Sequence, residues 1–245
     1  AREVLRGVED RLSVAASNSP RSTVLSGDPH ALQQVLETLT QRQVFCRPVK
    51  VNVASHSPQM EPLRAELLEL LGGLSPRASE VALHSTVLGR VAEGTELTPG
   101  YWVRNLREPV LLSQVVESLV AAGHGLFVEV SAHPVLLPSI EQTLAHLGKP
   151  GTVLPSLRRE QPERVVMLES LGRLYTEGRD ISWRAVTPEE GRQVSLPTYP
   201  WQRDRYWFQP GAAVHSAGGA DSIPAQDGPV MKLDAGSLLQ VRWEE

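Results

Sequence analysis

Apolar and polar residues follow a regular pattern along most of the chain, and this pattern predicts alternating helices and strands. Strict alternation predicts a strand, whereas apolar residues spaced by three or four positions predict an amphipathic helix. In the first part of the chain the predicted elements are a helix at residues 1–9, strands at 11–16 and 22–26, a helix at 29–43 and a strand at 47–53. This order predicts most of a ferredoxin-like subdomain that lacks its first strand.

The alternation of helices and strands continues downstream and predicts an α/β layer architecture. Ser57 can cap a helix whose first residue is Pro58, and Gly72 and Gly73 would end that helix. The apolar run at 126–130 is typical of a strand in a covered parallel sheet. The remaining predicted elements are a strand at 81–86 and helices at 111–122, 135–147 and 162–177.

The pattern changes toward the C-terminus. Residues 195–208 form an irregular aromatic and basic run, and residues 209–236 are rich in Gly, Ala, Ser, Pro and Asp, which is typical of a flexible linker. Alternation returns at 239–243, as in the first strand of a further domain. Because the chain begins with Ala and not with Met, we expect it to be a piece of a longer protein.

Composition narrows the class of protein. The chain has 245 residues, of which 41% are hydrophobic and 21% charged, which suffices for a hydrophobic core. The net charge of −4 argues against binding to nucleic acid or to an anionic membrane surface. Cys46 is the single cysteine, so neither an internal disulfide nor a Cys-rich metal cluster is expected. With no membrane-spanning run and no signal peptide pattern, we predict a cytoplasmic protein.

The sequence contains no complete set of catalytic residues. It has no G-x-S-x-G nucleophile motif, no glycine-rich phosphate loop and no metal-ligand spacing. His56 is the best single candidate, because it follows a predicted strand and precedes a capped helix whose dipole favours a neutral imidazole. A histidine there more often caps or packs locally. His133, in the loop after a buried strand, is a weaker candidate for lining a site.

Several ordered motifs resemble those of acyltransferase domains in modular type I polyketide synthases. They are RLSVAASNSPR at residues 11–21 with SGD at 26–28, VASHSPQM at 53–60, YWVRNLREPV at 101–110, FVEVSAHPVL at 127–136 and LPTYPWQR at 196–203. The resemblance runs over about residues 1–208. It implies a partial ferredoxin-like small subdomain, the C-terminal part of an α/β-hydrolase-like core of the malonyl-CoA:ACP transacylase type, and a linker.

The resemblance also implies a mechanism. In the family a serine takes an acyl group from acyl-CoA and passes it to the phosphopantetheine thiol of an acyl carrier protein. By analogy His56 is the general base, and the backbone carbonyl of Asn105 accepts a hydrogen bond that fixes its tautomer. The serine, the oxyanion-hole residues and the carboxylate-binding arginine precede the small subdomain in the family. We therefore predict that this chain alone has no transferase activity.

Substrate and partners follow from the same resemblance. The tetrad ending at the histidine is Val53-Ala54-Ser55-His56, and the small Ser55 leaves room for a branched, methylmalonyl-like extender unit, although Val53 matches neither known pattern. We predict no bound cofactor and no metal. The predicted partners are acyl-CoA, an acyl carrier protein and neighbouring ketosynthase and reductive domains, the strand at 239–243 resembling the start of a ketoreductase.

The predicted domain organisation has five parts. They are the partial ferredoxin-like subdomain at 1–52, the acyltransferase core at 53–148, the post-acyltransferase linker at 149–208, the flexible linker at 209–236 and the start of the next domain at 237–245. The aromatic residues expected to dock the linker on neighbouring domains are Tyr199, Trp201, Tyr206, Trp207 and Phe208. Two other functions stay open: a non-catalytic interaction module that docks synthase domains, and a hydrolase whose nucleophile lies upstream.

Overall fold

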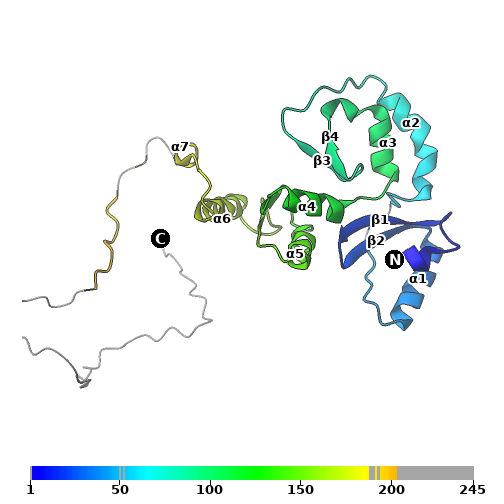
Figure 1. Ribbon diagram of the computed structural model, residues 1–245, viewed down its shortest axis with the longest axis horizontal. Coiled ribbons are helices and arrows are strands. Elements are labelled where there is room, and N and C mark those ends of the chain that lie inside the picture. Colours follow the sequence, from blue (N-terminus) through cyan, green and yellow to red (C-terminus); the bar gives the residue numbers. More distant parts are fainter. Residues whose placement is uncertain (1, 50, 52, 188–190, 192–193, 203–245) are drawn as a thin grey trace, which may run out of the picture. The chain divides into compact units, whose positions relative to one another are not determined.

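The computed structural model describes residues 2–49, 51, 53–187, 191 and 194–202 (Figure 1). The chain forms two units, Ala1–Glu189 and Glu190–Glu245, and each is considered by itself. All the helices and strands described below lie in the first unit. The predicted flexible linker at 209–236 and the predicted strand at 239–243 lie outside the described residues.

The N-terminal part of the first unit is a hairpin covered by one helix. A 3₁₀ turn, η1 (Arg2–Leu5), precedes strands β1 (Leu12–Ser19) and β2 (Ser22–Gly27), which pair antiparallel, and helix α1 (Pro29–Gln41) follows. Asp28 caps α1 by accepting a hydrogen bond from the N–H of Ala31 at 2.9 Å. The buried core of this part consists of Leu5, Leu12, Ala31 and Val35. The strands at 11–16 and 22–26 and the helix at 29–43 are therefore confirmed.

The predicted strand at 47–53 is wrong. Its described residues have no regular structure, and the side chains of Val49 and Val51 are 61% and 67% exposed. A strand needs a partner for its backbone groups, and the described residues of this segment pair with neither β1 nor β2. The ferredoxin-like arrangement is thus not confirmed, because the described residues show only the hairpin and one helix.

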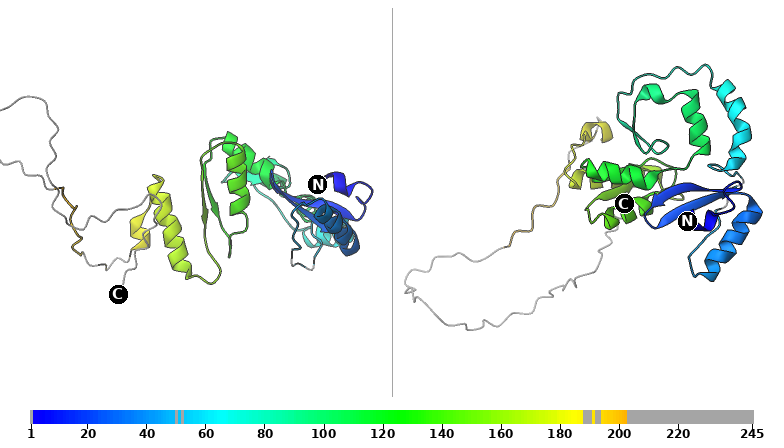
Figure 2. Two further views of the ribbon diagram at one scale, coloured as in Figure 1. Left: turned by 90° about the horizontal axis from the view of Figure 1, so that it is seen from below. Right: turned by 45° about the vertical axis from the view of Figure 1, so that its right-hand side comes forward.

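The middle part contains a short hairpin, two α-helices and two 3₁₀ turns. Its elements are η2 (Pro58–Leu63), α2 (Arg64–Leu70), β3 (Leu83–Ser85), β4 (Arg90–Ala92), η3 (Gly94–Glu96) and α3 (Pro99–Arg107). Figures 1 and 2 show α2 and α3 side by side, and contacts between the two helices agree. The single helix predicted after Ser57 is instead a 3₁₀ turn followed by an α-helix, because Pro62 lacks the N–H that a continuous α-helix would use.

The last part of the first unit is a β-α-β arrangement. Its elements are α4 (Leu112–Ala121), β5 (Leu126–Glu129), α5 (Leu137–His146), β6 (Thr152–Pro155), α6 (Glu163–Thr176) and α7 (Trp183–Val186). Strands β5 and β6 are parallel, with Leu126 opposite Thr152. Val116 of α4 packs with Ile140 and Leu144 of α5 to form a second core. The helices predicted at 111–122, 135–147 and 162–177 are confirmed. None of the helices in the described ranges is long and apolar enough to cross a membrane.

Candidate active site

The segment that carries His56 is tied down at the start of η2. The hydroxyl of Ser57 accepts a hydrogen bond from the N–H of Gln59 at 3.2 Å and donates one to the carbonyl of Ala54 at 2.6 Å. Ser57 is fully buried, and Pro58 is the first residue of the turn. The predicted cap is therefore confirmed, and it fixes the backbone directly after His56.

The backbone of His56 has an unusual conformation. Its φ angle is 62°, in the left-handed region that non-glycine residues seldom adopt. Two hydrogen bonds hold it there: the N–H of His56 donates to the carbonyl of Leu106 at 2.9 Å, and the carbonyl of His56 accepts from the hydroxyl of Ser13. The half-buried histidine is thus held from β1 on one side and from α3 on the other.

The imidazole of His56 has a defined tautomer. Its Nδ1 lies 2.8 Å from the carbonyl oxygen of Glu108. A carbonyl can only accept a hydrogen bond, so Nδ1 carries the proton and Nε2 of the neutral ring keeps its lone pair. This arrangement suits a general base acting through Nε2.

The predicted role of Asn105 is wrong, because the acceptor for His56 is the carbonyl of Glu108. Helix α3 ends at Arg107, and Glu108 is extended, with φ −87° and ψ 158°. Pro109 causes this break, since it has no N–H to continue the helix and restricts the residue before it to an extended conformation. The carbonyl of Glu108 therefore points out of the helix and toward His56. The proline in the sequence was the available signal for this assignment.

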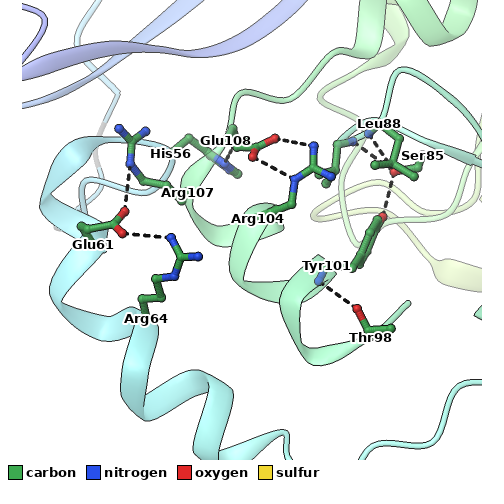
Figure 3. Close-up of polar contacts among 11 residues, drawn as sticks. His56, Glu61, Arg64, Ser85, Leu88, Thr98, Tyr101, Arg104, Arg107 and Glu108 are labelled. Atoms are coloured by element: carbon green, nitrogen blue, oxygen red, sulfur yellow. Dashed lines mark hydrogen bonds and ion pairs between the residues drawn. The ribbon is translucent and has the colours of Figure 1, made fainter. Parts of the chain in front are cut away.

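Ion pairs lie near the histidine, and one of them links η2 to α3 (Figure 3). Arg104 makes two 2.9 Å hydrogen bonds to the Glu108 carboxylate, which raise the pKa of the arginine. Glu61 lies between Arg64, at 3.2 Å, and Arg107, at 3.7 Å. These side chains are half-buried or exposed, so each pair adds little to stability. Of these pairs, the one between Glu61 and Arg107 joins η2 to the end of α3.

The start of α3 is fixed by a polar contact with the β3–β4 hairpin. The hydroxyls of Ser85 and Tyr101 are 2.9 Å apart in a buried environment, and the Ser85 oxygen also accepts from the N–H groups of Val87 and Leu88 (Figure 3). Thr98 caps the helix through the N–H of Tyr101. Helix α3 is thus anchored at both ends. Sequence analysis did not predict this helix, nor β4, although Thr98 and Pro99 form a start signal.

The residues predicted to select the substrate lie directly before His56. Val53 is exposed, whereas Ala54 and Ser55 are half-buried. Ala54 contributes its carbonyl to the Ser57 cap. Among the described residues, no three of His, Cys, Asp and Glu gather as metal ligands would.

His133 and a buried carboxylate form a separate polar cluster at the end of β5. The Nδ1 of the exposed His133 accepts from the N–H of Arg159 at 3.3 Å. Glu129, which sequence analysis did not single out, is buried and accepts hydrogen bonds from the N–H groups of Val135, Leu136 and Leu137 at 2.9–3.1 Å. Its position at the end of an apolar strand, just before a helix start, was the signal that could have identified it.

The linker aromatics are described only in part. Tyr199 and Trp201 form an edge-to-face pair with ring centroids 5.2 Å apart, and their side chains are 68% and 70% exposed. Tyr206, Trp207 and Phe208 lie outside the described residues.

Comparison with known proteins gives a consistent result. The family model described as "Acyl transferase domain" matches residues 1–181. Erythronolide synthase EryA2 of Saccharopolyspora erythraea is 41% identical over 239 residues, which are 97% of this chain and 7% of that protein. The spectinabilin polyketide synthase system protein NorA' of Streptomyces orinoci is 45% identical over 238 residues, 96% of this chain and 6% of that protein. The chain thus spans a small part of these relatives.

Solved structures give the same picture. The acyltransferase domain from module 8 of the salinomycin polyketide synthase superposes with a TM-score of 0.73 at 41% identity, over 75% of this chain and 43% of that one. The malonyl-CoA:acyl carrier protein transacylase FabD of Xanthomonas oryzae superposes with a TM-score of 0.59 at 25% identity, over 70% of this chain and 52% of that one. The α/β fold resembles theirs.

Proposed function

Because the chain belongs to the acyl transferase domain family and is homologous to the acyltransferase domains of modular type I polyketide synthases, we propose that it is the His-bearing part of such an acyltransferase. The proposed reaction moves an extender acyl unit from CoA to the phosphopantetheine thiol of an acyl carrier protein. The observation that carries the proposal is the 2.8 Å contact between His56 Nδ1 and the Glu108 carbonyl, which leaves Nε2 free to take a proton.

The proposed reaction has two steps. First, a serine hydroxyl attacks the thioester carbonyl carbon while Nε2 of His56 takes its proton; the C–S bond breaks, and the imidazolium returns the proton to the CoA sulfur. Second, the carrier thiol gives its proton to Nε2 and attacks the ester carbonyl carbon. The C–O bond to serine then breaks, and the serine oxygen recovers the proton.

The serine is proposed to come from a part of the acyltransferase outside these 245 residues, since the sequence has no G-x-S-x-G motif. Ser55, adjacent to the histidine, supports a branched, methylmalonyl-like extender unit because its small side chain leaves space for an α-methyl group. A pocket that gains or loses one methyl contact discriminates by only about 1–3 kcal/mol.

The test uses the complete acyltransferase that contains these residues, with labelled malonyl-CoA and methylmalonyl-CoA as competing substrates. We expect His56→Ala to lower the rate of acyl transfer about 10²- to 10⁴-fold, because the attacking oxygen and sulfur lose their base. His133→Ala is the matched control and should transfer at the wild-type rate. The 245-residue chain alone should form no acyl-enzyme. Full activity of His56→Ala would contradict the proposal, and release of the acyl group to water faster than to the carrier protein would favour a hydrolase.

A second proposed function is docking. Tyr199 and Trp201 present two large aromatic side chains to solvent, which supports a role in binding a neighbouring ketosynthase or reductive domain. The two functions are compatible, since one synthase module would use both.

A further inference from the structure

Strand β1 contacts both His56 itself and the segment that provides the hydrogen-bond acceptor for its imidazole. Its first edge pairs with β2, with Ser13 opposite Ser26. On the second edge Ala15 and Ser17 hydrogen bond to Val110, at 2.8 Å in both cases, two residues after the carbonyl that accepts from His56. One strand therefore fixes the segment that carries the imidazole acceptor.

The same strand reaches the histidine itself through a side chain. The hydroxyl of Ser13 donates to the backbone carbonyl of His56. Because the N–H of His56 is bound to Leu106, this hydroxyl supplies the other of the two hydrogen bonds that hold its backbone in the left-handed region. A rotation of φ toward the usual negative values would redirect the Cα–Cβ bond, and with it the ring.

We propose that Ser13 is a positioning residue for His56. Its hydroxyl holds the left-handed backbone that brings Nδ1 to the Glu108 carbonyl, and the Nδ1–H bond in turn keeps Nε2 unprotonated. The part of this inference that concerns turnover rests on the proposed acyl transfer. The part that concerns the tautomer of His56 does not.

Loss of the hydroxyl should have a specific chemical signature. Without the bond from Ser13 the His56 backbone relaxes, and the ring moves away from the Glu108 carbonyl. The hydrogen bond that favours a proton on Nδ1 is then lost. The tautomer with the proton on Nε2 then gains population, and in that tautomer Nε2 cannot accept a proton from an attacking group. A merely structural serine would lower stability without changing the tautomer.

The experiment measures the imidazole ¹⁵N chemical shifts of His56 in the complete acyltransferase, together with kcat and KM for acyl transfer. In Ser13→Ala we expect a shift of the tautomer toward Nε2–H, about a tenfold loss of kcat and little change in KM. Ser13→Thr keeps the hydroxyl and suits a strand, so it should restore the wild-type tautomer and the wild-type kcat. Ser26→Ala removes the hydroxyl directly opposite on β2, which makes no side-chain hydrogen bond within the described ranges, and should leave both unchanged.

An unchanged tautomer in Ser13→Ala would overturn the proposal, whatever the activity. A shifted tautomer in an enzyme whose wild type transfers no acyl group would support the positioning role and refute the proposed function instead. If Ser13→Ala does not fold, Ser13→Cys replaces it, because a thiol of similar size is a weaker donor and should give a smaller shift in the same direction.

Discussion

At the scale of single residues, Glu129 shows how a buried charge is accommodated. Its carboxylate lies at the end of β5 and accepts three backbone N–H groups at the start of α5, as well as the hydroxyl of Ser131 at 3.1 Å. Free N–H groups at a helix start carry partial positive charge and have no partner inside the helix. One side chain therefore satisfies the backbone where the chain turns from strand to helix.

Glu129→Gln should lower the free energy of unfolding by about 1–3 kcal/mol, because the amide nitrogen would face N–H donors and leave at least one of them unpaired. Urea denaturation of the complete acyltransferase would measure this loss. The matched control is Glu141→Gln on the exposed side of α5, which should stay within about 0.5 kcal/mol of the wild type. Equal stability of the two variants would show that the carboxylate is dispensable.

Residue-level chemistry at His56 was only partly predictable. Its place before a capped turn followed from Ser57 and Pro58, but its left-handed backbone and its bond to Ser13 depend on a strand more than 40 positions away. Family resemblance predicts Asn105 as the acceptor, whereas Pro109 determines that Glu108 presents it. A main-chain carbonyl has no residue type, so composition and spacing carry little information about it.

At the scale of elements, the β3–β4 hairpin is joined to η3 by an exposed ion pair. Arg90 makes 2.7 and 3.0 Å bonds to the Glu96 carboxylate, which also accepts from the N–H of Glu93 at 2.8 Å. These hydrogen bonds lower the pKa of Glu96 from 4.5 to about 2. The bond from Arg90 has the largest effect, and the bond from the backbone of Glu93 has the second largest.

A lowered pKa in the folded chain means that this contact stabilises the hairpin above about pH 4.5 and is lost as the pH falls toward 2. A ¹³C NMR titration of the Glu96 carboxyl should therefore have its midpoint near 2 in the wild type. Arg90→Gln should raise that midpoint toward 4.5, whereas Arg64→Gln, which removes an exposed pair elsewhere, should not. A midpoint near 4.5 in the wild type would contradict the contact.

Elements with strong periodicity were predicted well, whereas two of the four short strands were not predicted. The helices α1, α4 and α5 have apolar residues at helical spacing, and burial of one face then stabilises the expected structure. Helix α6 was also predicted from its spacing, but it buries only Val166. Strands β4 and β6, of three and four residues, were not predicted, whereas β3 and β5, of the same lengths, lie within segments predicted as strands. The segment at 47–53 has the pattern of a strand but no partner in the described chain, which shows that alternation alone does not make a sheet.

At the scale of the whole molecule, the second unit presents an exposed aromatic pair. Tyr199 and Trp201 contact each other but stay about two-thirds exposed. Large aromatic side chains at a surface contribute most when a partner covers them. The family match covers residues 1–181, so these two residues lie outside the matched region.

Replacement of both Tyr199 and Trp201 by Ala should change the free energy of unfolding by less than about 0.5 kcal/mol, because neither side chain is buried. If they dock a ketosynthase, the same variant should weaken association with the isolated ketosynthase domain at least about tenfold. Calorimetric titration would measure the second effect, with Val194→Ala from the same exposed segment as the control. Unchanged association would exclude these two residues from the interface.

The acceptor of the imidazole proton has a consequence for how this site tolerates genetic change. Because the Glu108 carbonyl belongs to the peptide backbone, almost any codon at that position preserves the oxygen that His56 needs. The constraint moves to the neighbouring position, where Pro109 ends the helix and turns the oxygen outward. We therefore expect substitutions to be tolerated at Glu108, which makes the contact, and not at Pro109, which orients the carbonyl.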